Sequence, residues 1–258
     1  LSQCVDMRSD AFSDCSSLIG PVCLDGLVTI PSSAFKGCSS LSGVSFNSAV
    51  SIGENAFHGC SSLSSVDFPS TLTSIGASAF RDCSLLLEAK IPNGVTSIGN
   101  NSFLGCTRLE LFETPSSLSN LGGAALQGCT GLKRAVLNGD GTLKLGKSLF
   151  RDCSSLESVV LGEGVASIDD GYYNSGWYST TYYGMFSNCS SLKSVDIRTK
   201  NLKKLPDYMF LDSSVETVRF AGGVEYVGYE AFYRCASLTS IEGELKPTIV
   251  TNAAFSGC

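Results

Sequence analysis

The sequence contains few of the residues on which enzyme active sites depend. It has a single histidine, His58, a single tryptophan and three methionines. It contains no HExxH motif, no phosphate-binding or dinucleotide-binding glycine loop, and no Ser–His–Asp order around that histidine. Equivalent segments elsewhere in the chain carry Lys36, Arg81 or Leu104 in place of His58, so we expect it at the surface. The sequence therefore predicts a protein that is not an enzyme.

Positive charge and long apolar runs are also scarce. Lys and Arg together number 18 against 24 Asp and Glu, which gives a formal net charge of −6 at pH 7. A chain of this sign has no basic field to attract nucleic acid or anionic lipid. No apolar stretch approaches the roughly 20 residues that a membrane-spanning helix needs. We therefore expect no nucleic-acid partner and no direct membrane span within these residues.

Cysteine and glycine, in contrast, are abundant, and most cysteines follow a fixed pattern. The 258 residues include 12 Cys and 27 Gly. A phenylalanine followed three residues later by a cysteine recurs at steps of 22–24 residues, with one step of 36. The copies are Phe12/Cys15, Phe35/Cys38, Phe57/Cys60, Phe80/Cys83, Phe103/Cys106, Leu126/Cys129, Phe150/Cys153, Phe186/Cys189, a degenerate copy around Phe210, Phe232/Cys235 and Phe255/Cys258. These copies cover the whole chain, so we infer a repeat protein with a unit of about 23 residues.

A second pattern fills the space between the copies. After each cysteine comes a strand-like segment whose apolar residues lie two apart, as in Val66 and Phe68. Three of these segments end at a proline, which cannot donate to a sheet: Pro69, Pro92 and Pro115. A shorter apolar pair and a glycine follow, and we expect Gly76 and Gly99 to take positive φ in tight turns. The Phe–x–x–Cys segment itself predicts one helical turn.

One unit is too small to bury its own apolar face, so stacked units must share a continuous core and a parallel sheet. The stretch CSSLSSVDFPSTLTSIGASAF, residues 60–80, resembles the BspA-type leucine-rich repeat, and the resemblance extends over essentially the whole chain. The prediction is then an α/β repeat solenoid, a right-handed leucine-rich-repeat coil with a parallel β-sheet on one face and short helical turns and loops on the other. We expect a single solenoid over residues 1–258, with about 11 units. The resemblance also implies roles in adhesion and protein recognition.

Ten cysteines share one repeat position and would form a column along the stack. They are Cys15, Cys38, Cys60, Cys83, Cys106, Cys129, Cys153, Cys189, Cys235 and Cys258. Parallel Cβ vectors would hold neighbouring Cβ atoms about 4.8 Å apart, beyond the roughly 3.5–4.5 Å of disulfides. A line of thiols is not a tetrahedral metal site either, so we expect small buried apolar fillers. Cys4 and Cys23 lie outside the column, and a disulfide between them stays an open alternative.

The 36-residue step contains an aromatic insertion, DDGYYNSGWYSTTYYG, at residues 169–184. Its aromatic residues are Tyr172, Tyr173, Trp177, Tyr178, Tyr182 and Tyr183. Tyr and Trp offer a large contact area at low entropic cost and are enriched at recognition sites, so the insertion is a candidate protein contact. The alternative is that its rings pack on the flank of the solenoid. Its Asp–Asp–Gly start lacks the further oxygen ligands of a calcium loop, and we expect neither metal nor cofactor.

The strand positions that point away from the core are mostly small or charged. Leu111, Val136 and Val160 are apolar on neighbouring units, which makes them a candidate patch for a partner, although scattered exposed aliphatic residues are also common. One unit is irregular, because MFLDSSVETV, residues 209–218, has lost a residue and places Asp212 near the cysteine position. We expect Asp212 to lie in solvent, since an unpaired buried carboxylate is costly.

Two functional interpretations remain, and both are non-enzymatic. The first is a binding or adhesion module, at the cell surface or secreted, that recognises another protein through the sheet face and the aromatic insertion. The second is a structural subunit or scaffold held permanently in a larger multiprotein complex, intracellular or organellar, where free thiols would be compatible with the environment. In both interpretations the partner is a protein.

Overall fold

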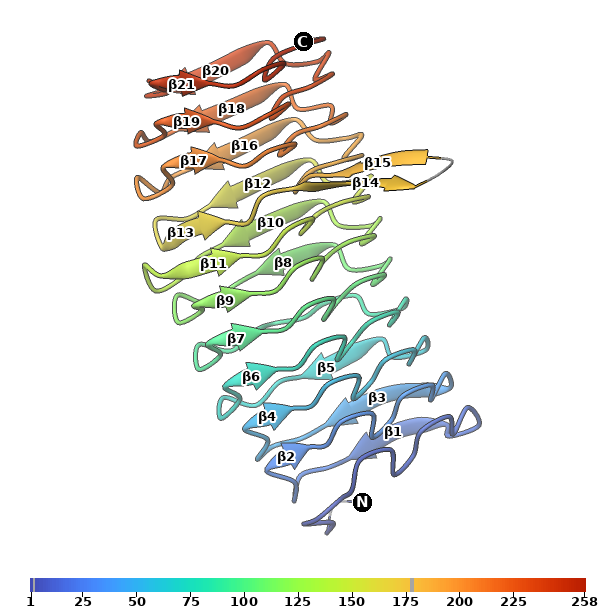
Figure 1. The fold of residues 1–258 in the computed structure, drawn as a ribbon. Helices are drawn as coiled ribbons and strands as arrows, with labels where there is room; N and C mark the ends of the chain where they lie inside the picture. Colours follow the sequence, from blue (N-terminus) through green and yellow to red (C-terminus); the bar gives the residue numbers. More distant parts are fainter. Residues whose placement is uncertain (2, 177–178) are drawn as a thin grey trace.

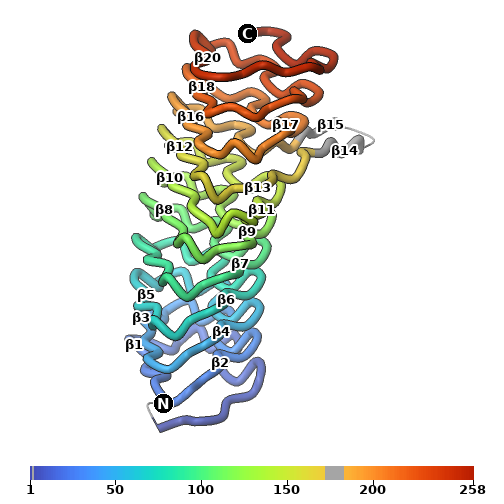
Figure 2. Tube along the Cα trace, turned by 90° about the vertical axis from the view of Figure 1, so that its left-hand side faces the viewer, coloured from blue at the N-terminus to red at the C-terminus, as the bar shows by residue number. Residues whose placement is uncertain are grey.

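The computed structural model describes residues 1, 3–176 and 179–258, which form a stack of similar coils (Figure 1). The N-terminal and C-terminal coils lie at opposite ends of the stack in both views (Figures 1 and 2). Two series of parallel strands run along it, and one antiparallel hairpin extends from its side. The described residues include no helix, and therefore none that is long and apolar enough to cross a membrane.

The first series carries the longer strands and forms the main sheet, which lies in two parts. The first part has the order β1 (Gly20–Cys23), β3 (Leu41–Ser45), β5 (Ser65–Asp67). The second part contains β8 (Leu111–Glu113), β10 (Arg134–Leu137), β12 (Ser158–Leu161), β16 (Ser194–Ile197), β18 (Thr217–Phe220) and β20 (Ser240–Gly243). Each strand pairs with the strand of the next coil in parallel, so one repeat position always lies opposite itself.

The second series consists of short strands that follow the proline or glycine turns. Its first part contains β2 (Thr29–Ile30), β4 (Ser51–Ile52), β6 (Ser74–Ile75), β7 (Ser97–Ile98), β9 (Asn120–Leu121), β11 (Leu143–Leu145) and β13 (Val165–Ile168). Its second part contains β17 (Lys204–Leu205), β19 (Tyr226–Val227) and β21 (Ile249–Val250). The aromatic insertion forms the hairpin β14 (Tyr172–Gly176) and β15 (Ser179–Tyr183), at the point where this series is interrupted.

The expected helical turn at each Phe–x–x–Cys segment is wrong, and with it the α/β class. The backbone N–H groups of this corner alternate between two kinds of acceptor. Every second N–H donates to the next coil, as Phe57 does to the carbonyl of Ala79 at 2.8 Å. The N–H groups between them close local turns, as His58 does to the carbonyl of Asn55 at 3.1 Å. A helix would need all of these groups for bonds within its own segment, so the corner is instead a third hydrogen-bonded column.

Backbone conformation explains why the corner cannot be helical. In the coil of Phe57, Asn55 and Gly59 have φ angles of 55° and 75°. The next coil repeats the feature with Ser78 at 53° and Asp82 at 58°. Left-handed residues on both sides of the phenylalanine interrupt a right-handed helix, and they make the chain fold as successive turns. The solenoid is therefore built from strands and turns.

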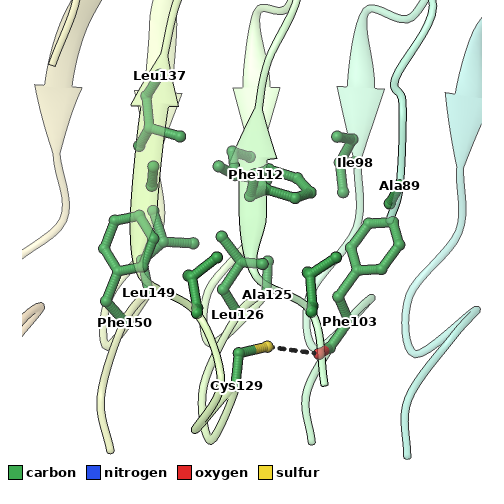
Figure 3. Close-up of a cluster of buried hydrophobic side chains, with 14 of the residues drawn as sticks. Ala89, Ile98, Phe103, Phe112, Ala125, Leu126, Cys129, Leu137, Leu149 and Phe150 are labelled. Carbon is green, nitrogen blue, oxygen red and sulfur yellow. Dashed lines mark hydrogen bonds between the residues drawn. The ribbon is translucent and has the colours of Figure 1, made fainter. Parts of the chain in front are cut away.

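The phenylalanine column forms the centre of the core. Neighbouring rings from Phe12 to Phe103 and from Phe150 to Phe255 lie 4.8–5.6 Å apart and within 15° of parallel. Leu126 takes the phenylalanine position between Phe103 and Phe150, and all three side chains are fully buried (Figure 3). Since each coil contributes one ring to a stack that it shares with two neighbours, no coil has a core of its own.

The cysteine column is buried in its middle, as expected, but Cys15 and Cys258 at its two ends are exposed, and the buried thiols are more than apolar fillers. Eight of them are fully buried: Cys38, Cys60, Cys83, Cys106, Cys129, Cys153, Cys189 and Cys235. Each thiol donates to the carbonyl of the phenylalanine position in the preceding coil at 3.0–3.2 Å, as Cys129 does to Phe103 (Figure 3). Burial raises the pKa of these thiols, to about 11 for Cys38 and about 12 for Cys60. Cys4 and Cys23 are free thiols in this structure.

The irregular unit keeps the column with a different residue. Asp212 is exposed, as expected, and its carboxylate lies 3.9 Å from the guanidinium of Arg234. Ser213 occupies the cysteine position, is 3% exposed, and donates its backbone N–H to the carbonyl of Phe210 at 3.0 Å. Its hydroxyl lies 3.6 Å from the sulfur of Cys235. Serine therefore replaces cysteine while the corner keeps its geometry.

The glycines at the end of the short strands have a different role from the one expected. Gly76 and Gly99 do not have positive φ. A Cβ atom on Gly76 would lie 2.7 Å from the backbone of Glu54, and one on Gly99 would lie 2.5 Å from the backbone nitrogen of Ala77. At Gly76 and Gly99 successive coils approach each other too closely for a side chain, whereas other coils carry Pro31, Asp169, Pro206 or Thr251 at the equivalent position.

The two strand series are interrupted at different coils. In the main sheet, β5 and β8 belong to separate sheets because residues 88–91 between them form no backbone hydrogen bonds with described neighbours. The second series continues across this coil through the β6–β7 pair, and the rings of Phe80 and Phe103 stay 5.4 Å apart. The stack is therefore opened on its main-sheet side only.

Candidate binding surface

The exposed face of the main sheet presents two rows of side chains along the stack. In the C-terminal part of the sheet, the first row passes from Leu111 through Arg134 to Ser158. The second passes from Glu113 through Val136 to Val160. Leu111 is 41% exposed, whereas the two valines are half-buried. The face is a flat array of charged, hydroxyl and aliphatic groups spaced about one coil, or roughly 4.8 Å, apart.

The strand register places the three residues of the predicted apolar patch in two different rows of the sheet. Val136 lies directly opposite Val160, so these two side chains are neighbours in the second row. Leu111 lies opposite Arg134, in the first row, and the residue opposite Val136 on that side is Glu113. Val136 and Val160 thus form a directly paired apolar unit, with Leu111 diagonal to Val136, and the role of the three residues as one patch stays a prediction.

Leu111 belongs instead to the opening in the main sheet. Together with Glu113 it lines a hollow of about 330 Å³ beside residues 88–91. A second hollow of about 200 Å³ lies on the other side of this segment, against β5. Glu88 and Lys90 line both hollows, and their charged groups form an ion pair at 3.1 Å. The opening is thus lined by this ion pair together with the aliphatic side chains of Ala89, Ile91 and Leu111.

The aromatic insertion is a hairpin that projects from the side of the stack (Figure 1). Its strands pair Tyr172 with Tyr183 and Tyr173 with Tyr182. The predicted contact residues Trp177 and Tyr178 lie outside the described residues. The side chains of Tyr172, Tyr173 and Tyr182 also lie outside the description, so their predicted role in contacting a partner stays a prediction.

The last tyrosine of the insertion packs against the solenoid. The guanidinium carbon of Arg151 lies 3.9 Å from the ring centroid of Tyr183, which is half-buried. Such a cation–π contact is worth about 0.5–2 kcal/mol, depending on how far the pair is desolvated. The local-packing interpretation therefore applies to Tyr183, at the base of the hairpin.

An ionic cluster holds the other strand of the hairpin. The carboxylate of Asp170 lies 2.7 Å from the ammonium of Lys204 and accepts a hydrogen bond from the backbone of Asp207 at 3.2 Å. Burial lowers the pKa of Lys204, but the contacts with Asp170 and Asp207 outweigh it, and the net pKa is raised. Asp170 is thus engaged in anchoring the insertion. Among the described residues, no group of His, Cys, Asp and Glu side chains has a geometry that suits a metal ion.

His58 is half-buried rather than fully exposed. Its Nε2 lies 3.4 Å from the carboxylate of Asp82 in the next coil, and its Nδ1 is buried without a hydrogen-bond partner. It lies in the Phe–x–x–Cys corner, away from the residues of the main-sheet face.

A charged hollow at the rim of the main sheet was not predicted from the sequence. It has a volume of about 510 Å³ and follows the ends of β12, β16 and β18. Its charged lining consists of Glu163, Asp196, Arg198, Lys200 and Arg219. One sequence feature could have pointed to this hollow. The run RTKNLKK, residues 198–204, has four cationic residues among seven, although the chain as a whole is acidic.

The repeat matches a known protein family over almost the whole chain. The model of the BspA type leucine rich repeat region matches residues 5–133, 85–178 and 175–258, in six copies. The chain belongs to the BspA-type leucine-rich repeat family. The repeat positions that this family implies are the ones that form the two strand series and the phenylalanine column. No curated protein matches the sequence significantly.

Solved structures of leucine-rich repeat proteins resemble this fold. A leucine rich repeat protein of T. pallidum is 28% identical, with a TM-score of 0.55 over 67% of this chain and 77% of that chain. A leucine rich cell surface protein of Faecalibacterium prausnitzii is 18% identical, with a TM-score of 0.52 over 90% of this chain and 81% of that chain. The second likeness concerns the fold alone.

Proposed function

We propose that this chain is a non-enzymatic protein-binding module, exposed at the cell surface or secreted, that contacts its partner through the main-sheet face and the aromatic hairpin. The observation that carries the proposal is the valine pair on a flat, solvent-facing sheet. Val136 and Val160 lie next to each other among charged and hydroxyl groups, which is the mixture found in protein interfaces. The BspA-type family, to which the chain belongs, favours roles in adhesion and thus an exposed location.

The hairpin supports the same function through its composition and position. The insertion contains the only tryptophan of the chain and five of its nine tyrosines. The described strands β14 and β15 project from the side of the stack (Figure 1). Aromatic side chains of this kind dominate binding energy where they become buried by a partner. Its base is fixed by the Arg151–Tyr183 and Asp170–Lys204 contacts, which would limit the entropy lost on binding.

The test compares the capture of proteins from the native source by the wild type and three variants of the chain. One variant carries Val136→Lys and Val160→Lys, and a second carries Trp177→Ala, Tyr178→Ala and Tyr182→Ala. A matched control carries Thr96→Lys, which adds a lysine at an exposed position on the other side of the coil. The proposal predicts a protein captured by the wild type and the control, and captured at least about tenfold less by the other two.

Equal capture by all four proteins would contradict the proposal. A large fall in Tm for the aromatic variant would instead favour packing of the hairpin on the solenoid flank. The mass of the native particle separates the proposal from a permanent structural role, since a subunit fixed in an assembly would be found only in a large complex. A free chain that binds reversibly is the expected result.

A further inference from the structure

We propose that the rim hollow and the valine pair together recognise an extended protein segment in which an apolar residue is followed, three residues later, by a carboxylate. The proposal rests on the proposed function and specifies the chemistry of the partner. It starts from the second row of the main-sheet face, where Val136, Val160, Asp196 and Arg219 lie opposite one another on four successive coils.

The rim hollow has two cations that form no ion pair within the described residues, and one of them, Arg219, lies between Asp196 and Glu242 of the neighbouring coils. Arg198 is paired with Asp196, whose carboxylate oxygen lies 2.8 Å from its Nε. Lys200 and Arg219 are both exposed and form no ion pair with any described residue. Three cations thus face two carboxylates in this hollow, within a chain whose net charge is −6. An acidic ligand would find here the charge that most of the surface lacks.

The cations are held on a well-ordered turn. Thr199, between Arg198 and Lys200, is fully buried, and its hydroxyl donates to the carbonyl of Val165 at 2.6 Å. The same hydroxyl accepts the backbone N–H of Asn201 at 3.1 Å. Because the side chain of Thr199 is fixed in the interior, the side chains of Arg198 and Lys200 on either side of it point toward solvent. Binding would therefore require ordering of side chains only.

The spacing follows from the coil repeat. Val160 and Arg219 are separated by two coils, or about 9.6 Å at roughly 4.8 Å per coil. An extended segment in the polyproline II conformation rises about 3.1 Å per residue and returns a side chain to the same side every third residue, so it covers this distance in three residues with both side chains on the sheet. Asp196 lies one coil from Val160, so a carboxylate that followed the apolar residue more closely would meet a like charge. The row thus favours one spacing and disfavours shorter ones.

The valine pair favours a protein segment over an acidic glycan. A glycan could use the cations, but it would gain little from two aliphatic side chains. The hollow also has no exposed aromatic ring on which a sugar would stack, since its only aromatic residue, Phe220, is 2% exposed. An apolar side chain beside a carboxylate uses both parts of the surface.

Fluorescence anisotropy with labelled ten-residue peptides tests this inference. The peptides have a Gly–Ser background with one Leu, followed one to six residues later by an Asp, and each has a matched Asn version. We expect the tightest binding at a spacing of three and about tenfold weaker binding for its Asn version. Equal binding by the Asp and Asn peptides, or no dependence on spacing, would overturn the inference.

Variants of the protein locate the site. K200E with R219E should weaken binding of the best peptide about tenfold, and the milder pair K200Q and R219Q should weaken it less. The control pair K36E and R108E changes the net charge equally at exposed cations that form no ion pair with described residues, and should leave binding unchanged. Loss of binding in the control pair would mean that the effect is general electrostatics, which overturns the inference. If the native partner is captured through the valines but is insensitive to K200E and R219E, this inference fails while the proposed function stands.

Discussion

The thiol of each buried cysteine connects two coils. The sulfur donates to the carbonyl of the phenylalanine one coil back, while the backbone N–H of the same cysteine donates to the phenylalanine of its own coil. Each phenylalanine carbonyl therefore accepts two hydrogen bonds, one from the backbone N–H of the cysteine in its own coil and one from the thiol of the cysteine in the next coil. Sulfur is a weak donor, but the bond places a small, apolar side chain where a longer one would not fit. Ser213 shows that a serine also fits this position, where its hydroxyl lies 3.6 Å from the sulfur of Cys235.

Alkaline pH should destabilise the protein through these thiols. Their folded-state pKa is raised by burial, to about 11 for Cys38 and about 12 for Cys129, above the ordinary 9.0. The folded protein holds these protons more tightly than the unfolded chain, so the stabilisation is complete below pH 9.0 and is lost as pH rises toward the folded values. Each thiol then removes about 1.4 kcal/mol per pH unit, and several together would unfold the chain.

Urea denaturation at several pH values between neutrality and pH 10.5 (roughly one and a half units above the ordinary thiol pKa) measures this effect. The free energy of unfolding should be nearly constant below pH 9 and fall steeply above it. A variant with Cys106→Ser and Cys129→Ser should show a shallower fall, because serine does not titrate in this range. An identical slope in that variant would contradict the role assigned to the thiols.

At the scale of the single element, two glycine positions of the coil perform different tasks. Gly59 has a φ of 75°, and a Cβ there would have its nearest neighbour 3.7 Å away. Gly76 has ordinary φ, but a Cβ there would lie 2.7 Å from the backbone of the preceding coil. One glycine therefore serves backbone conformation, and the other serves close contact between coils.

Alanine substitutions at these two positions should separate the effects. Gly59→Ala adds the strain of a left-handed alanine and should cost about 1 kcal/mol. Gly76→Ala forces two coils apart and should cost about 2–3 kcal/mol. Gly59→Asn should cost less than Gly59→Ala, since Asn188 already occupies the equivalent position at a φ of 62°. Thermal unfolding of the three variants gives the order, and a larger loss for Gly59→Ala would contradict this account.

The sequence predicted the strands better than the corners. The strands were predictable because apolar residues two apart, such as Val66 and Phe68, are typical of a strand with one buried face. The corner was mistaken for a helical turn because its hydrogen bonds run to the next coil, and such bonds leave no local periodicity in the sequence. Gly76 was misassigned for the same reason, since its constraint comes from a residue 22 positions earlier.

The candidate surface was predictable only in part. Val136 and Val160 could be chosen because equivalent repeat positions must be neighbours. Leu111 was grouped with them because it is apolar on a neighbouring coil, although the repeat places it in the other row of the sheet. The rim hollow was missed because Glu163, Arg198 and Arg219 come from three different coils, and only stacking brings them together.

For the whole molecule, the staggered interruptions of the two sheets define where the stack should be easiest to open. Amide hydrogen exchange should be fast at residues 88–91, which form no backbone hydrogen bonds with described neighbours. It should be slow at residues 134–137, whose strand is paired on both sides. Equal protection of the two segments would mean that the main sheet is continuous in solution.

The central claim is that coils stack in register and hide a single column of thiols between them. Alkylation of the native protein with iodoacetamide, followed by mass spectrometry of each cysteine peptide, tests it most directly. We expect rapid labelling of the exposed Cys15 and Cys258, slower labelling of the half-buried Cys4 and Cys23, and protection of the eight buried thiols until the chain unfolds as a whole. Rapid labelling of cysteines in the middle of the column, such as Cys106 or Cys129, under native conditions would contradict the stacked-coil account.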